Sequence, residues 1–379
     1  MILIYIIIAV AFIDTFSQLP IIAPFAIEVG ASPLLVGVII GMYSFANMLG
    51  NLLSGVWIDR IGSKRILYVG MLTVGVIIFF YSMVSNVYEL LGIRFFHGMA
   101  GGLIVPAAFT FLGSRGERAE NGRTMAYSGA GVGIAAIAGP AIGAIVSGRF
   151  GYNFLFYFIS SLMIVFGVLA AVFLREKSIL RTSAVKHNTI PNLKELVPAY
   201  LSIFLLMYTL GLLTYSLPLK VIDLNLFTEL TGILLSVFGL IAILIFVLPT
   251  NRVFDQWNKS RLMKSGLIVI SIALFYLAFA VTLSHMVVAM VIYGIGFALI
   301  FPSASGTVIE RTREKERGKA FGLFYAFFSL GVICGSFSAG VFSFLPAYQF
   351  VIGAMLVLLT LFIYSIVAML WKRSNVNKK

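Results

Sequence analysis

The sequence predicts an all-α membrane protein with twelve transmembrane helices in two pseudo-symmetric six-helix bundles. Three observations lead to this fold class. Hydrophobic residues make up 60% of the chain, whereas charged residues make up 11%. Long apolar stretches recur along the sequence, and each can cross a hydrocarbon core about 30 Å thick. Twenty-four of the 27 Lys and Arg residues lie in every second gap between these stretches or in the C-terminal tail.

The predicted helices follow one another from the first residue. Eight stretches have the length of a single span: 1–27, 29–58, 66–88, 90–112, 124–148, 150–174, 196–219 and 230–251. Two more, 265–309 and 320–371, are too long for one helix. We expect them to break at Ser284-His285 and at Leu345-Pro346, which completes the set of twelve.

The basic residues also predict the orientation. The other set of gaps, which alternates with the basic ones, contains only two basic residues, Arg149 and Lys220. By the positive-inside rule, both termini and the loops after even-numbered helices are cytoplasmic, and the protein is expected in the cell membrane. The net charge of +13 is spread over short loops and a tail, which favours contact with anionic lipid and not with nucleic acid.

Composition excludes several classes of site. The chain has one cysteine, Cys334, inside a predicted helix, and three histidines. We therefore expect no disulfide framework, no metal site and no cofactor. We expect the lipid bilayer, a small-molecule substrate and protons as partners, with the chain acting as a monomer.

The two halves of the chain repeat each other at an offset of 196 residues. The matched pairs are Asp59 and Asp255, Arg65 and Arg261, and the runs 98–108 and 294–304. The predicted organisation is a bundle at 1–174, a cytoplasmic linker at 175–195, a bundle at 196–371 and a tail at 372–379. Parallel repeats place a substrate site between the halves near the membrane midplane. This favours a carrier over an enzyme or a channel.

Three motifs resemble those of the major facilitator superfamily. The run 55–65, Gly-Val-Trp-Ile-Asp-Arg-Ile-Gly-Ser-Lys-Arg, resembles the loop 2–3 signature. Residues 94–98 resemble the helix-4 signature, with His97 in place of the usual Gln. Residues 133–143 resemble the helix-5 Gly-Pro signature of drug:proton antiporters, with Ala144 in place of the last Gly. The resemblance covers essentially the whole chain and implies that helices 1, 4, 7 and 10 surround a central cavity.

Asp14 and Arg94 are the deep charges of the predicted spans. Asp14 lies about 16 Å from the cytoplasmic end of its helix at 1.5 Å per residue. A charge at such depth costs about 2.5–3.5 kcal/mol, so both residues should face a cavity or a partner. The family resemblance puts their helices around the cavity, where the two could meet. The pair is then a proton switch, a substrate-binding pair or a permanent ion pair. His97, one turn from Arg94, is either a proton relay or a packing residue.

Further polar residues are candidates for lining the substrate cavity. Tyr43 and Asn47, with Asn51, form a stripe on one helix face; the stripe either faces the cavity or bonds to a neighbouring helix. Gln18, Tyr215 and Tyr293 complete the list of candidate cavity residues.

The loop motifs predict gates. Asp59 and Asp255 follow the cytoplasmic ends of helices 2 and 8, where each could dock on a helix N-terminus of the opposite half. The accompanying gate residues are Arg60, Arg65 and Arg261, together with Gly139 and Pro140, which allow close packing and a kink. The predicted function is proton-coupled export of amphipathic small molecules or drugs by alternating access. The alternatives are a carrier of one metabolite (a sugar, a siderophore-like chelate or a lipid-linked compound) and a non-transporting receptor.

Overall fold

The computed structural model describes residues 2–113, 121–175, 192–247, 257–313, 316–342 and 346–376. Within these ranges the regular secondary structure is entirely helical. Eleven helices are long and apolar enough to span a membrane, and a bent pair at the N-terminus raises the number to twelve. The prediction of an all-α protein with twelve spans is confirmed.

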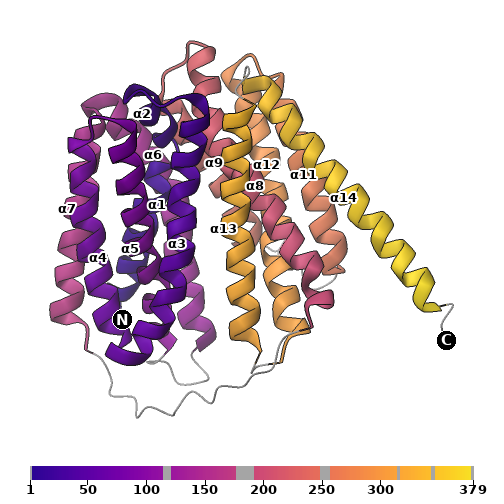
Figure 1. The fold of residues 1–379 in the computed structure, drawn as a ribbon, viewed down its shortest axis with the longest axis horizontal. Coiled ribbons are helices and arrows are strands. Elements are labelled where there is room, and N and C mark those ends of the chain that lie inside the picture. Colours follow the sequence, from indigo (N-terminus) through magenta and orange to yellow (C-terminus); the bar gives the residue numbers. More distant parts are fainter. Residues whose placement is uncertain are drawn as a thin grey trace.

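Two bundles stand side by side (Figure 1). The first contains α1 (Ile2–Gln18), α2 (Ile22–Glu28), α3 (Pro33–Ile61), α4 (Ser63–Phe80), the 3₁₀ turn η1 (Tyr81–Met83), α5 (Val87–Gly113), α6 (Asn121–Phe150) and α7 (Tyr152–Phe173). The second contains α8 (Leu193–Asp223), α9 (Glu229–Val247), α11 (Lys259–Ala278), α12 (Leu283–Arg311), α13 (Arg317–Val341) and α14 (Pro346–Val376). We call the lower side of Figure 1, where the N-terminus lies and where α7 ends and α8 begins, the linker side, and the upper side the far side.

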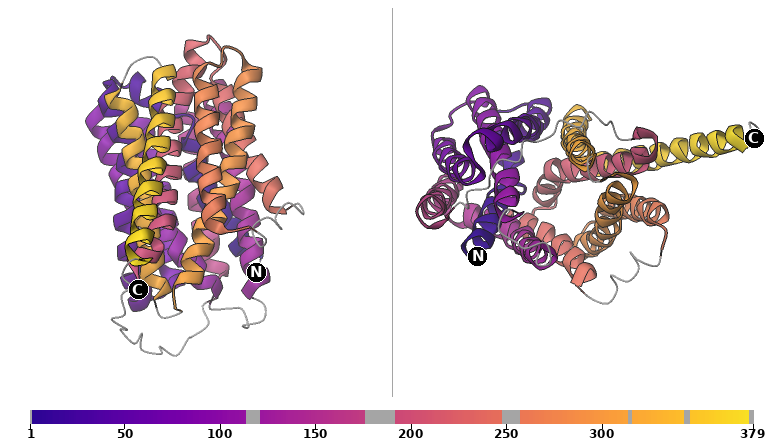
Figure 2. Two further views of the ribbon diagram at one scale, coloured as in Figure 1. Left: turned by 90° about the vertical axis from the view of Figure 1, so that its right-hand side faces the viewer. Right: turned by 90° about the horizontal axis from the view of Figure 1, so that it is seen from below.

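The same helix pairs pack together in both bundles. In the first bundle α1 contacts α6, α3 contacts α5, and α4 contacts α7. In the second, α8 contacts α13, α9 contacts α12, and α11 contacts α14. These are equivalent pairs under the repeat, and the view from the linker side shows the two groups of helices next to each other (Figure 2). α14 leans away from the second bundle toward the linker side (Figure 1).

The first predicted span is broken. The expected single helix 1–27 is divided into α1 and α2, which meet at an angle of 49°. Pro20 lies in the break. Proline has no N–H for the helical hydrogen bond and disfavours helical geometry in the residue before it, so the helix ends here. The bend turns α2 over the far side of the first bundle (Figure 1).

Capping side chains explain the shift of two further predicted boundaries. The break expected at Ser284-His285 lies between Ala278 and Leu283, because the side chain of Thr282 caps α12 by accepting a hydrogen bond from the His285 N–H. The helix expected at 66–88 ends earlier, because Asn86 accepts hydrogen bonds from the N–H groups of residues 88 and 89 and so begins α5. The η1 turn between α4 and α5 brings Tyr81 into the interior, where it is fully buried.

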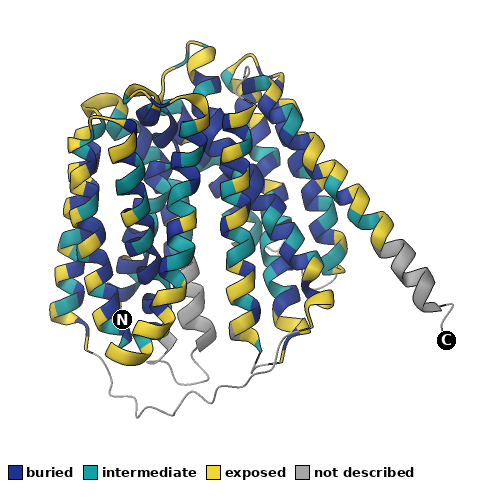
Figure 3. Cartoon of the chain, in the orientation of Figure 1, coloured by how far each residue is buried: buried dark blue, intermediate teal, exposed yellow. Residues whose placement is uncertain are grey.

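The two bundles contact each other mainly in their far halves. On one seam, α3 packs on α13, and a Cβ atom at Gly37 or Gly340 would collide with backbone across the seam. On the other seam, α6 packs on α9, and Ser236 donates a hydrogen bond to the carbonyl of Ile137. On the linker side the end of α3 is exposed, including Trp57 at 41% (Figure 3). The described conformation is therefore closed on the far side.

Candidate functional site

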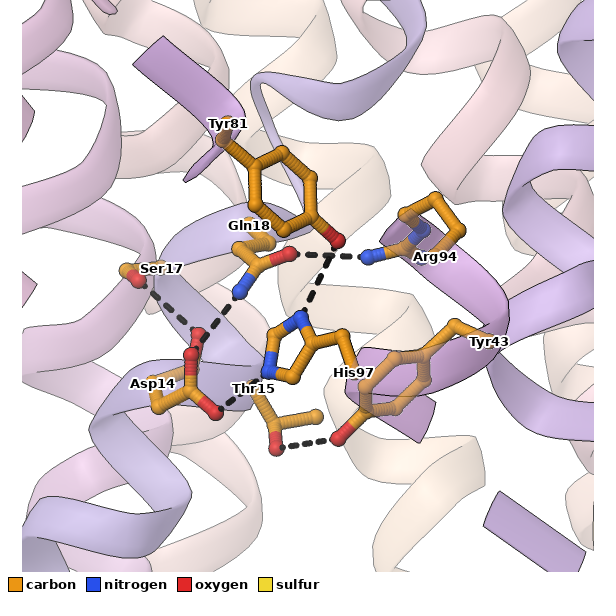
Figure 4. A network of polar contacts seen from close by, with 8 residues as sticks. All are labelled: Asp14, Thr15, Ser17, Gln18, Tyr43, Tyr81, Arg94 and His97. Atoms are coloured by element: carbon orange, nitrogen blue, oxygen red, sulfur yellow. Dashed lines mark hydrogen bonds and ion pairs between the residues drawn. The ribbon is translucent and has the colours of Figure 1, made fainter. Parts of the chain in front are cut away.

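The candidate site is a buried polar network in the first bundle (Figure 4). Asp14 of α1 is only 2% exposed. Its Oδ1 accepts a hydrogen bond of 2.8 Å from Gln18 Nε2, and its Oδ2 lies 3.0 Å from His97 Nε2. Both carboxylate oxygens therefore have a partner, as a buried charge requires.

Helix geometry brings these side chains together. Asp14 and Gln18 are four residues apart on α1, and Arg94 and His97 are three apart on α5, so each pair shares one helix face. Gly98 lets α5 approach α3 closely, because a Cβ atom there would lie 3.0 Å from the Cβ of Ala46 and collide with α3 backbone. The polar side chains of α1, α3 and α5 thus share one small volume.

Arg94 reaches Asp14 through Gln18, not by direct contact. Its Nη1 donates a 2.8 Å hydrogen bond to Gln18 Oε1, and its Nε donates a 3.3 Å bond to the carbonyl of Ile39. The guanidinium also lies over the ring of Tyr43, 4.7 Å from the centroid. Asp14 and Arg94 thus lie in one network without direct contact: the Gln18 amide accepts from the cation and donates to the carboxylate, so a neutral group links the two charges.

His97 is the direct partner of Asp14. The imidazole is fully buried, with Nδ1 3.0 Å from the hydroxyl of Tyr81. The Tyr43 ring stands edge-on to it at 5.0 Å between centroids. Sequence reasoning missed Tyr81, since nothing in the sequence separates it from the other fifteen tyrosines of the chain. Tyr81 reaches His97 because α4 ends at Phe80 and the following η1 turn places the Tyr81 side chain in the interior.

The network can accept a proton with little rearrangement. A neutral His97 carrying its proton on Nε2 donates to Asp14 and accepts from the Tyr81 hydroxyl on Nδ1. An added proton occupies Nδ1, and the Tyr81 hydroxyl then rotates to become the acceptor. Arg94 balances the charge of Asp14 through Gln18 in both states. The arrangement has the chemistry of a buried proton-binding site.

The polar stripe of α3 lies at the contact with α5. Tyr43 and Asn47 are half-buried; the Tyr43 hydroxyl is 3.2 Å from the hydroxyl of Thr15, and Asn51 donates a 3.0 Å hydrogen bond to Asn47. A Cβ atom at Gly101 of α5 would lie 3.0 Å from the Tyr43 hydroxyl. Tyr43 and Asn47 therefore pack against α5 while part of their surface stays accessible.

Two predicted cavity residues are buried in this conformation. Tyr215 is 2% exposed, and its hydroxyl donates a 3.1 Å hydrogen bond to the carbonyl of Pro33 in the other bundle. Tyr293 is fully buried, 2.9 Å from the hydroxyl of Thr209. Tyr215 thus belongs to the far-side seam and Tyr293 to the interior of the second bundle. Tyr215 is enclosed because the far halves of the bundles are in contact, whereas Tyr293 is enclosed by α8 and α9 of its own bundle.

The predicted gate residues of the linker side are exposed. Asp59 and Arg60 end α3, and Arg65 is in the first turn of α4 after Gly62, whose φ of 94° makes the turn. Within the described ranges the Asp59 carboxylate forms no ion pair. Arg261 is exposed at the start of α11, and Asp255 lies outside the described residues.

The Gly139-Pro140 segment of α6 lies between α1 and the second bundle. A Cβ atom at Gly139 would lie 2.7 Å from the Cβ of Phe16, so the glycine allows α6 to pack on α1 beside the network. On the opposite face, the carbonyl of Pro140 is in close contact with Gly232 of α9. This segment connects the network to the far-side seam.

In the described ranges no three His, Cys, Asp or Glu side chains gather closely enough to hold a metal ion.

The profile of the Major Facilitator Superfamily matches residues 4–198 and again residues 199–379. An uncharacterized MFS-type transporter of Methanocaldococcus jannaschii is 23% identical over 331 residues, covering 85% of each chain. Multidrug resistance protein 2 of Bacillus subtilis is 22% identical over 349 residues, covering 88% of this chain and 86% of the relative.

Solved structures share the fold. A bacterial homolog to the human lysosomal transporter Spinster, in an inward-facing and unoccupied conformation, has a TM-score of 0.76 at 12% identity, with 97% of this chain and 94% of that chain covered. A POT family transporter in complex with 5-aminolevulinic acid has a TM-score of 0.81 at 11% identity, with 96% and 95% covered.

Proposed function

The chain belongs to the major facilitator superfamily, and from that premise we propose that it is a proton-coupled exporter of amphipathic small molecules in the cell membrane. The bundles at 1–174 and 196–371 rock about the site between them and expose it to each side in turn. Protons move inward as substrate moves outward.

The network of Asp14, His97 and Tyr81 is the observation that carries this proposal. Its members are buried and hydrogen-bonded in series, and Arg94 is coupled to them through Gln18. Placing an ionisable group inside a membrane span costs free energy, so a group found there usually has a function. Movement of α1 against α5 would change the hydrogen bonds of this network and its access to water. Such a change would load or release the proton.

The charge distribution supports the proposed orientation. Lys and Arg are concentrated in the loops and tail of the linker side, so that side is cytoplasmic in the proposal. The far-side contacts between the bundles then make the described conformation inward-open. In the outward-open state, Asp59 and Asp255 dock on helix starts of the opposite half and close the cytoplasmic gate, with Arg60, Arg65 and Arg261 beside them. The seam around Gly139 and Pro140 opens instead.

The substrate class rests on composition and on relatives. Hydrophobic residues form 60% of the chain, which suits an apolar or weakly charged substrate. Several relatives are named as multidrug resistance proteins, two of them from Bacillus subtilis. The proposed polar contacts to the substrate are Gln18, Tyr43 and Asn47, which are half-buried or next to the network. Two further contacts, Tyr215 and Tyr293, form only after the far side opens.

Transport by purified protein in liposomes tests the proposal. An imposed proton gradient should drive accumulation of a fluorescent cationic dye, and a protonophore should abolish it. Asp14→Asn should lose accumulation against a gradient but keep downhill exchange. Asp223→Asn, which removes an exposed carboxylate at the end of α8, is the matched control. Uphill accumulation by Asp14→Asn would exclude Asp14 as the coupling residue.

A further inference from the structure

A cavity of about 490 Å³ opens on the far side, away from the polar network. Both bundles line it. The first bundle contributes the break between α1 and α2, the helix α2 itself, and the connection from α6 to α7. The second bundle contributes Pro218 of α8 together with Thr228 and Thr231 at the start of α9. We call this cavity the far vestibule.

The walls of the far vestibule are rigid and carry both polar and apolar groups. Pro20, Pro24 and Pro218 lie around it with Phe25 and Phe150. Phe25 is itself held in place, because its ring packs against Tyr152 at 5.2 Å and against Phe156 at the same distance between centroids. These proline and aromatic side chains offer contacts to flat or bulky hydrocarbon groups of a ligand, beside the polar groups of the lining.

The charged residue in the described lining of the far vestibule is Glu28 of α2, and Arg149 lies outside the lining, next to Gly148 and Phe150. A second carboxylate comes from the other bundle: Glu229 of α9 lies over Gly148, where an added Cβ atom would be 2.6 Å from its Cδ. Hydroxyl groups of Ser147 and Thr228 add acceptors. A cation is therefore attracted here, and an anion of the same shape is repelled.

We propose that the far vestibule binds an amphipathic organic monocation from the far side and that the bound cation holds the two bundles together there. The binding site stands independently, because it lies apart from Asp14 and His97. The consequence for transport rests on the proposed function: a ligand that both bundles contact in the far-closed state stabilises that state. Occupancy therefore slows transport without competing for the substrate site.

Binding to purified protein tests the site without any transport assay. The probe is tetraphenylphosphonium, and tetraphenylborate is the anion of matching shape. We expect Glu28→Gln to weaken tetraphenylphosphonium binding by up to about fivefold, the range of a solvent-exposed ion pair, and added salt to do the same. Ser147→Phe fills the cavity without a change of charge and should abolish this binding. Glu89→Gln removes an exposed far-side carboxylate outside the vestibule and should leave binding unchanged.

Asp14→Asn separates the vestibule from the central site. Binding that is retained in Asp14→Asn and weakened in both vestibule variants supports the proposal. Binding that disappears in Asp14→Asn, or that is equal in Glu28→Gln, Ser147→Phe and the parent, overturns it. In liposomes, tetraphenylphosphonium added on the far side should lower the maximal transport rate of the parent but not of Ser147→Phe. Vestibule binding without any measurable transport would contradict the proposed function and leave the site standing.

Discussion

His97 and Tyr293 occupy equivalent positions in the two bundles, 196 residues apart, and each contacts the two equivalent neighbouring helices through different chemistry. His97 stands edge-on to Tyr43 at 5.0 Å and bonds to Asp14 on α1. Tyr293 stands edge-on to Phe238 at 5.4 Å and bonds to Thr209 on α8. Met290 takes the place that corresponds to Arg94. The first bundle thus holds the ionisable version of a constellation whose second copy is neutral.

This relationship predicts how charge contributes to stability. Asp14→Asn alone leaves Arg94 without its countercharge. Arg94→Met, which introduces the residue type found at the equivalent Met290, leaves Asp14 without one. Each single change should lower the free energy of unfolding by up to about 3–5 kcal/mol, the cost of an unpaired buried charge. The double variant removes both charges and should recover much of that loss. Thermal unfolding of the four proteins in detergent measures the cycle, and simple additivity of the two losses would show that the charges do not interact.

The imidazole of His97 predicts a role in coupling transport to protons. In His97→Gln the amide can still donate to Asp14, but it cannot take up a proton. Downhill transport should therefore persist, whereas accumulation driven by the proton gradient should fall. Dye transport in liposomes, measured with and without an imposed gradient, gives the two rates. An unchanged ratio of driven to downhill transport would exclude His97 from proton coupling.

Tyr81 has a narrower predicted role. Tyr81→Phe removes the hydroxyl bonded to His97 Nδ1 and leaves the ring packing in place. The protonated imidazole then lacks an acceptor, so coupling should weaken while the protein remains folded; an unsatisfied buried polar group costs about 1–3 kcal/mol. The ratio of uphill to downhill transport measures this. An unchanged ratio would mean that Tyr81 serves only to fill space.

The far-side seam should respond to a single methyl group. In Gly37→Ala the new Cβ would collide with the backbone carbonyl of Ser336, which cannot move aside without separating α3 from α13. The population should shift toward the far-open state. Gly55→Ala is the matched control on the same helix, because nothing lies within 4 Å of its added methyl.

Spin labels at Ser32 and Asn225, in a background with Cys334 replaced by Ser, report this opening. Both positions are exposed on the far side, one in each bundle. The distance distribution should gain a longer component in Gly37→Ala and stay unchanged in Gly55→Ala. Equal distributions in both variants would show that the seam tolerates the methyl and does not control the opening.

Asp59 should act on the opposite side. In the outward-open state its carboxylate is proposed to dock on the start of α13, an interaction worth up to about 2 kcal/mol when partly buried. Asp59→Asn should therefore reduce the population of that state by up to roughly 30-fold. Cysteines at Ile61 and Arg317, in a background lacking Cys334, should crosslink less readily in the variant. Similar crosslinking in variant and parent would leave Asp59 without a role in the gate.

The sequence by itself determined the spans and the residues worth attention. Length and apolarity fix a membrane helix almost independently of its neighbours, because every backbone group must be satisfied within the helix. The twelve-span prediction therefore needed no tertiary information. The cost of a charge in the same environment singled out Asp14 and Arg94 in the same way, and matched pairs and runs at one offset identified the repeat.

Only the tertiary structure decided which groups meet. His97 reaches Asp14 across 83 residues of sequence, and Arg94 reaches Gln18 across 76. Such contacts depend on how far each helix is rotated and shifted against its neighbour, and those quantities follow from packing at positions such as Gly98 and Gly139 and from the bend at Pro20. A pattern within one helix gives the direction of a side chain but not the depth at which another helix passes it. For that reason three features became visible only in the folded chain: the Gln18 bridge, the hydrogen bond of Tyr81 to His97 and the burial of Tyr215.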